Sequence, residues 1–144
     1  MNLVDANVLL YAVNRSDPRH ERARDWLDAE LSGGTTVGFA WIVLLAFLRL
    51  STRVGLFPRP LATADAVDIV RAWLAQPPAV VVQETPNHLE VLADLLGPIG
   101  AGGNLATDAH LAALAVEHRA GVVTFDSDFA RFPGVRWSPP GPPA

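Results

Sequence analysis

Three aspartates that lie far apart in the sequence stand where an α/β protein gathers its ligands. Asp5 ends a short apolar segment, NLVD, and Asp126 follows another, VVTF; Asp108 opens the helical stretch that leads into this second segment. Ligands of parallel sheets collect at the carboxyl ends of the strands. We therefore expect the three carboxylates to meet at one edge of a sheet.

Carboxylates do not gather without a positive partner. Two like charges about 4 Å apart repel by roughly 4 kcal/mol at an effective dielectric constant near 20. Mg²⁺ or Mn²⁺ removes this repulsion, accepts oxygen ligands, polarises a phosphoryl oxygen and activates a water molecule for attack on a phosphodiester. The spacing predicts a site for such a cation, with Asp128 as a further ligand or an orienting group.

Each aspartate also has a simpler interpretation. Asp5 and Asp108 stand where a helix N-cap is expected, and an aspartate at a helix start commonly does no more than cap it. Asp126 and Asp128, followed by Phe129, fit a turn with an aspartate cap on a short helix. Spacing alone leaves both interpretations open.

The elements that position these residues alternate between strand and helix along the chain. This alternation predicts one α/β domain with a mostly parallel central sheet and helices on both faces. Strands are expected at 2–5, 35–39, 79–83, 122–125 and 135–137, with 79–83 buried on both faces. Helices are expected at 6–14, 17–31, 40–53, 61–76, 86–100 and 105–120. The domain should span 1–137, with a flexible connection at 101–104 and a proline-rich tail at 138–144.

Size and composition exclude several classes of protein. The 144 residues suffice for one domain with a substantial core, and half of them are hydrophobic. The absence of cysteine excludes disulfides and thiolate metal sites, and the four histidines lack zinc-ligand spacing, so we expect ordinary surface or core imidazoles. The start of the chain shows no signal peptide, and VGFAWIVLLAFL is too short to cross a bilayer, so we expect a cytoplasmic protein without a membrane span.

All 11 basic residues are arginine, in a chain whose formal net charge is −4. Arginine suits bidentate phosphate contacts, although a GC-rich genome also favours it. The missing lysine excludes phosphate-accepting receiver domains, P-loop nucleotidases and phosphatases that resemble haloacid dehalogenases. The last class also needs a second aspartate at the position of Asn7.

The ordered motifs of the chain resemble the PIN-domain family, and within it the VapC-type toxins of bacterial toxin–antitoxin pairs. The resemblance covers nearly the whole chain and rests on LVDANVLLYAVN, WIVLLAFLRLSTR and ATDAHLAALAVEHRAGVVTFDSDFARFPG. It implies a metal-dependent endoribonuclease that cuts transfer or ribosomal RNA, is inhibited by a VapB-like antitoxin and works as a homodimer. By position it assigns the catalytic metal ligands to Asp5, Asp108 and Asp126, and supporting roles to Asn7, Thr124 and Asp128.

The sequence departs from the family at one position. Family members carry a glutamate three residues before the arginine that corresponds to Arg49, and here that position is Ala46. One carboxylate of the usual four is therefore missing. The alternative to a nuclease is a PIN-like domain with weak or lost activity that only binds RNA or an antitoxin-like partner.

RNA would need positive contacts around an acidic centre. Arg49 and Arg53 follow the central helix and are the predicted RNA-binding residues, although Arg49 could instead anchor the active-site helices. Trp41 could stack on a base, but a core position is the better interpretation. A second group on the early helix could bind phosphates or form a solvated, ion-paired face: Arg15, Arg19, Arg22 and Arg24.

Overall fold

The computed structural model describes residues 1–100, 103 and 105–141. In this part of the chain, a 5-stranded sheet has the order β3-β2-β1-β4-β5, and every pairing is parallel. The predicted fold class is confirmed. The strands are β1 Asn2–Val4, β2 Val37–Ala40, β3 Ala79–Val82, β4 Gly121–Val123 and β5 Trp137–Ser138.

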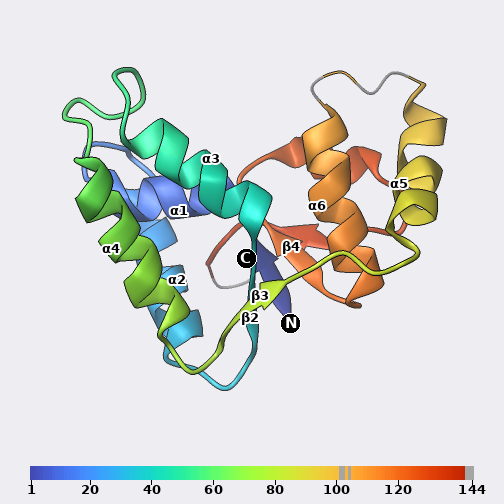
Figure 1. Ribbon diagram of the computed structural model, residues 1–144, viewed down its shortest axis with the longest axis horizontal. Helices are drawn as coiled ribbons and strands as arrows, with labels where there is room; N and C mark the ends of the chain where they lie inside the picture. Colours follow the sequence, from blue (N-terminus) through green and yellow to red (C-terminus); the bar gives the residue numbers. More distant parts are fainter. Residues whose placement is uncertain (101–102, 104, 142–144) are drawn as a thin grey trace.

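Helices cover both faces of the sheet. Figure 1 shows α1 to α4 gathered on one side and α5 and α6 on the other. The chain builds β1, β2 and β3 in one direction and then returns to place β4 on the free side of β1, which makes β1 and β4 neighbours at the switch point. The helices are α1 Ala6–Val13, α2 His20–Leu31, α3 Trp41–Ser51, α4 Thr63–Leu74, α5 His88–Leu96 and α6 Leu105–Glu117, with short 3₁₀ helices η1 Gly97–Ile99 and η2 Ser127–Arg131.

The core lies between the sheet and its helices. Leu3, Phe39 and Phe47 are fully buried there. A side chain at position 38 would displace the buried Leu3, because a Cβ built on Gly38 would lie 2.3 Å from Leu3 Cδ2. The buried face of α6 is rich in alanine, which lets this helix approach the sheet closely and brings its first turn to the sheet edge.

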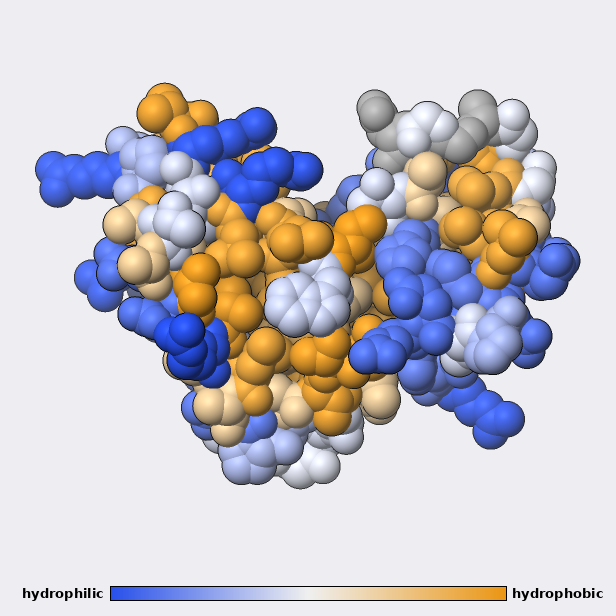
Figure 2. All heavy atoms as spheres, viewed as in Figure 1, coloured by the Kyte–Doolittle hydropathy of each residue, from blue (hydrophilic) through white to orange (hydrophobic). Residues whose placement is uncertain are grey.

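The predicted strand at 79–83 exists, but the prediction that it is buried on both faces is wrong. Val80 and Val81 are 38% and 37% exposed, because β3 is the edge strand and has a neighbour on one side only. The core interpretation of Trp41 is also wrong, since this residue is 52% exposed. Figure 2 shows the broad apolar surface over this face of the molecule.

Element ends differ slightly from expectation. The second helix begins at His20 rather than at residue 17, because the Asp17 carboxylate accepts a hydrogen bond from the Arg19 N–H at 2.8 Å and closes a turn there. The last strand extends to Ser138, and Pro140 is buried with its carbonyl accepting a bond from Arg22 Nε at 2.5 Å. The flexible connection expected at 101–104 lies largely outside the described residues, as does the end of the tail at 142–144.

The histidines are satisfied by protein partners, as expected. His88 Nδ1 lies 2.6 Å from Glu117 Oε2, and His88 Nε2 lies 2.8 Å from His110 Nδ1. The rings of His20 and His118 contact the carbonyls of Tyr11 and Gln83. None of the helices in the described part of the chain has the length and apolar character that a membrane span requires.

Candidate active site

The ends of β1 and β4 are joined by a network of hydrogen bonds centred on Asp5. Its Oδ1 accepts from the Ala6 N–H at 2.7 Å, so Asp5 is the N-cap of α1. Its Oδ2 accepts from the Thr124 hydroxyl at 2.7 Å and from Asn7 Nδ2 at 3.2 Å. The Asp5 backbone N–H donates to the Val123 carbonyl at 3.0 Å, which extends the strand pairing up to the site.

Asn7 and Thr124 connect this network to the second strand. Thr124 is fully buried, and its Oγ1 accepts from Asn7 Nδ2 and from the Asp126 N–H, both at 3.0 Å. Asn7 Oδ1 accepts from the Phe125 N–H at 3.0 Å. These two residues therefore hold the segment that carries Asp126 against the first turn of α1.

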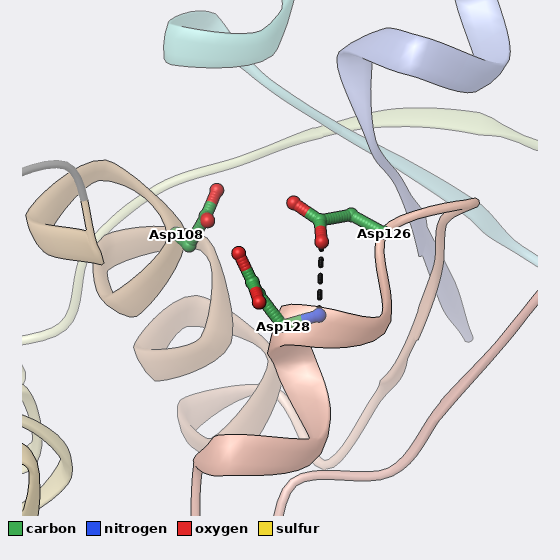
Figure 3. Close-up of side chains that lie close together, drawn as sticks. All are labelled: Asp108, Asp126 and Asp128. Carbon is green, nitrogen blue, oxygen red and sulfur yellow. Dashed lines mark hydrogen bonds between the residues drawn. The ribbon is translucent and has the colours of Figure 1, made fainter.

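Three carboxylates come together beside this network. Asp108, Asp126 and Asp128 each offer an oxygen within 4.8 Å of the others, and Figure 3 shows their side chains pointing toward one another. Asp108 comes from the first turn of α6, and Asp126 precedes η2, which carries Asp128. The Asp128 N–H donates to Asp126 Oδ1 at 2.9 Å, so one turn fixes both residues.

The structure shows which of the aspartates cap a helix. Asp108 is not a helix cap, because α6 begins three residues earlier at Leu105. Asp5 and Asp126 do cap α1 and η2, in addition to lying at the strand ends. Asp5 lies outside the group of three carboxylates, although it lines one small cavity together with Asp108, so its role as a metal ligand stays a prediction.

The site carries a strong negative field. Burial raises the pKa of Asp108 to about 6, and the charges of Asp5, Asp126 and Asp128 add to this effect. Burial also raises the pKa of Asp5, although the hydrogen bonds from Thr124 and Ala6 oppose the shift. Oxygen donors without nitrogen or sulfur suit a hard divalent cation such as Mg²⁺ or Mn²⁺. The residues present therefore fit the cation that the family implies.

The raised pKa of Asp108 leads to a prediction for the metal-free protein. The pKa of Asp108 is about 6 in the folded state and near 3.8 when unfolded, so folding favours the protonated form. The stabilisation is complete below the unfolded value and is lost as the pH rises through about 6. We expect the melting temperature of the metal-free protein to fall more steeply between about pH 4 and about pH 6 than that of Asp108→Asn. Equal slopes in differential scanning calorimetry would contradict this prediction.

Ala46 lines the same small cavity as Asp5 and Asp108. The cavity has a volume of about 40 Å³, and its other walls come mainly from apolar residues of α3 and α6. The position to which the resemblance assigns a glutamate therefore faces the acidic site, and the alanine of this chain leaves a void there.

The arginines predicted to bind RNA lie at the far end of α3. Arg49 stands in its last turn and Arg53 in the loop that follows, and both are exposed. The structure does not join Arg49 to any acidic residue in the described ranges, so the anchoring alternative has no support here. On α2, Arg24 pairs with Asp25, as the solvated-face interpretation expects, and before this helix Arg19 pairs with Asp17.

Comparison with known proteins gives both sequence relatives and fold neighbours. A model of the PIN domain matches residues 3–135. Ribonuclease VapC37 of Mycobacterium tuberculosis (strain ATCC 25618 / H37Rv) is 59% identical over 140 residues, which cover 97% of this chain and 97% of the relative. Ribonuclease VapC33 of the same strain is 39% identical over 140 residues, with 97% of this chain and 98% of the relative covered.

Two solved structures share the fold. VapBC2 from Rickettsia felis, bound to a DNA fragment from its promoter, matches with a TM-score of 0.72 at 17% identity and covers 97% of this chain and 98% of its own. VapC20 from Mycobacterium tuberculosis, a sarcin-ricin loop cleaving toxin, matches with a TM-score of 0.68 at 22% identity, covering 94% and 99%. At these identities the structures support the fold alone.

Proposed function

This chain belongs to the PIN-domain family, and on that premise we propose that it is a metal-dependent endoribonuclease, the toxin of a VapBC-type toxin–antitoxin pair. The observation that carries the proposal is the convergence of Asp108, Asp126 and Asp128 within 4.8 Å. Burial and, to a lesser extent, the charges of the neighbouring aspartates raise the pKa of Asp108, and a bound cation would relieve both effects. The relatives VapC37 and VapC33 are named ribonucleases.

The proposal assigns a role to each residue of the acidic site. Asp108, Asp126 and Asp128 would hold Mg²⁺ or Mn²⁺, and Asp5 would complete the site from the side of β1. When bound, the cation supplies polarisation of a phosphoryl oxygen and an activated water for hydrolysis of the phosphodiester. Asn7 and Thr124 would keep the Asp5 carboxylate oriented through their hydrogen bonds.

Partners follow from the same proposal. An RNA substrate, either transfer or ribosomal, would place the protein in the cytoplasm. The neighbouring VapBC structures are toxin–antitoxin complexes, so we propose a VapB-like antitoxin as the inhibitor of this chain. We also propose a homodimer, for which the exposed apolar residues Trp41 and Leu45 of α3 offer a surface.

Removal of the metal tests the proposed activity. The purified chain should cleave bacterial total RNA with Mg²⁺ or Mn²⁺ present, and excess EDTA should abolish cleavage, because the carboxylates by themselves repel the phosphate. Adding back the divalent cation should restore the activity, whereas Na⁺ at equal ionic strength should not. Cleavage that persists in EDTA would contradict the metal-dependent mechanism. Mapping the ends of the cleaved RNA would identify the substrate and the cleavage site.

A second function has one specific observation in its favour. Ala46 leaves a void where the family carries a carboxylate, so the chain could have kept partner binding while losing catalysis. RNA binding without cleavage at millimolar Mg²⁺ or Mn²⁺ would support this alternative. We favour the nuclease because Asp108 and Asp126, two of the three aspartates that the resemblance assigns to the metal, converge with Asp128, which a protein that only binds RNA does not require.

A further inference from the structure

Two open pockets meet at the C-terminal end of α1. The first lies between the loop after α1 and the loop that joins α3 to α4, and the second lies between the end of α1 and the start of α2. The loop between α3 and α4 is at the upper left of Figure 1. One has a volume of about 370 Å³ and is lined by residues of both loops, including Arg15 and Arg59. The other has a volume of about 480 Å³ and is lined by Arg15, His20 and Arg24. Arg15 therefore stands between the two pockets.

The titratable groups that line both pockets are arginines and one histidine, in a chain whose net charge is −4. Arg15 and Arg59 form no ion pair with any residue in the described ranges, unlike Arg24, which pairs with Asp25. Both are exposed, and Figure 2 shows hydrophilic side chains projecting at this corner. Their guanidinium groups are thus available to an anionic ligand.

Helix α1 links these pockets to the acidic site. Its N-cap is Asp5, and its last residue, Val13, lines both pockets. The helix has 8 residues and a length of about 12 Å at a rise of about 1.5 Å per residue. A single RNA strand whose scissile phosphate lies at the aspartates would cover this distance within a few nucleotides.

We propose that Arg15 and Arg59 form a phosphate-binding subsite for single-stranded RNA, at the opposite end of α1 from the catalytic aspartates. The inference rests on the proposed function, since it assigns a further contact to the same substrate. A guanidinium group binds a phosphate through two parallel hydrogen bonds. The successive phosphates of an RNA strand could each contact one of the arginines in the two adjoining pockets. Val13 and Leu61 line the same pocket as Arg15 and Arg59 and offer an apolar surface to a ribose or a base.

An acidic peptide is the competing ligand. A peptide anchored by one apolar side chain would need a single deep pocket with cations at its rim. Here the cations continue from the first pocket into the second, where Arg24 and His20 lie, and this spread favours a polyanion.

The salt dependence of RNA binding tests the subsite. The full chain carrying Asp108→Asn, which prevents cleavage, is titrated into a short fluorescein-labelled single-stranded RNA at several salt concentrations, and the fluorescence anisotropy is measured. Each phosphate contact of a single strand adds about −0.7 to the slope of log K against log salt. Arg15→Gln and Arg59→Gln should each flatten the slope by about 0.7 and weaken binding about 5-fold at about 0.1 M salt. The control Arg71→Gln, an exposed arginine of α4 that pairs with Asp68, should leave the slope unchanged.

Charge, rather than shape, should account for the effect. Arg15→Lys should therefore retain most of the salt slope, because a lysine keeps the phosphate contact as a point charge. Unchanged slopes in Arg15→Gln and Arg59→Gln would overturn the subsite, and so would variants that bind RNA normally but no longer bind an acidic peptide. A wild-type chain that cleaves RNA while these slopes stay unchanged refutes the subsite alone. A chain that binds RNA through both arginines but never cleaves it refutes the nuclease alone.

Discussion

Asp108→Asn should lower the rate of RNA cleavage by at least about 10³-fold, because a metal supplies several kcal/mol of charge stabilisation to a phosphoryl transition state and about 1.4 kcal/mol is a factor of ten. Asp108 is one of the three carboxylates that converge, and the structure shows no capping role for it. Asparagine has nearly the same shape and removes only the charge. Loss of activity should therefore come without loss of the fold.

The same variant should be more stable than the wild type when no metal is present. At neutral pH the wild-type carboxylate is held charged in a partly buried, negative environment, which asparagine relieves. Initial rates on a defined RNA and a thermal melt in EDTA measure the two effects together. Asp94→Asn, at an exposed position of α5, is the matched control and should change neither. An active Asp108→Asn enzyme would rule out the proposed metal site.

Ala46→Glu should tighten the binding of Mn²⁺ by about 10-fold or more, in the range by which single supporting residues alter metal affinity. The side chain would enter the void that Ala46 shares with Asp5 and Asp108 and would add a further carboxylate to the site. The added charge also increases repulsion in the metal-free state, so this variant should melt at a lower temperature in EDTA than the wild type.

Ala46→Gln separates charge from size in this experiment. Glutamine fills the void to the same extent but offers a neutral amide, so its Mn²⁺ affinity should stay close to that of the wild type. Titration calorimetry without RNA measures all three proteins. Equal or weaker affinity in Ala46→Glu would show that the cation binds away from this cavity, on the side of Asp126 and Asp128.

The acidic site was predictable from sequence because its members stand at positions with a local meaning. Asp5 and Asp126 each follow a short apolar strand, and parallel strands must end at the same edge. The spacing of Asp126 and Asp128 likewise predicted a turn that carries two carboxylates. The spacing did not reveal that Asp128 belongs to the same group of converging carboxylates as Asp108 and Asp126. Nor did it reveal that the Asp5 carboxylate accepts hydrogen bonds from Thr124 and Asn7.

Exposure was the least predictable property. The run of apolar residues at 79–83 indicated a strand buried on both faces, but the strand order places it at the edge of the sheet. Trp41 lies in an apolar helix, yet half of its surface remains exposed. Both errors have one cause: hydrophobicity reports that a residue favours burial, and the neighbours that bury it come from distant parts of the chain.

Local residue order determined the succession of strands and helices, the turns that hold Asp5 and Asp126, and the absence of a carboxylate at position 46, because each depends on neighbours in the chain. Tertiary structure alone decided that β4 returns beside β1, that Ala46 faces a void next to Asp5 and Asp108, and that Arg15 and Arg59 share a pocket. The reason is physical: these relations join segments separated by tens of residues, and only the packing of the sheet and its helices sets the distances between them.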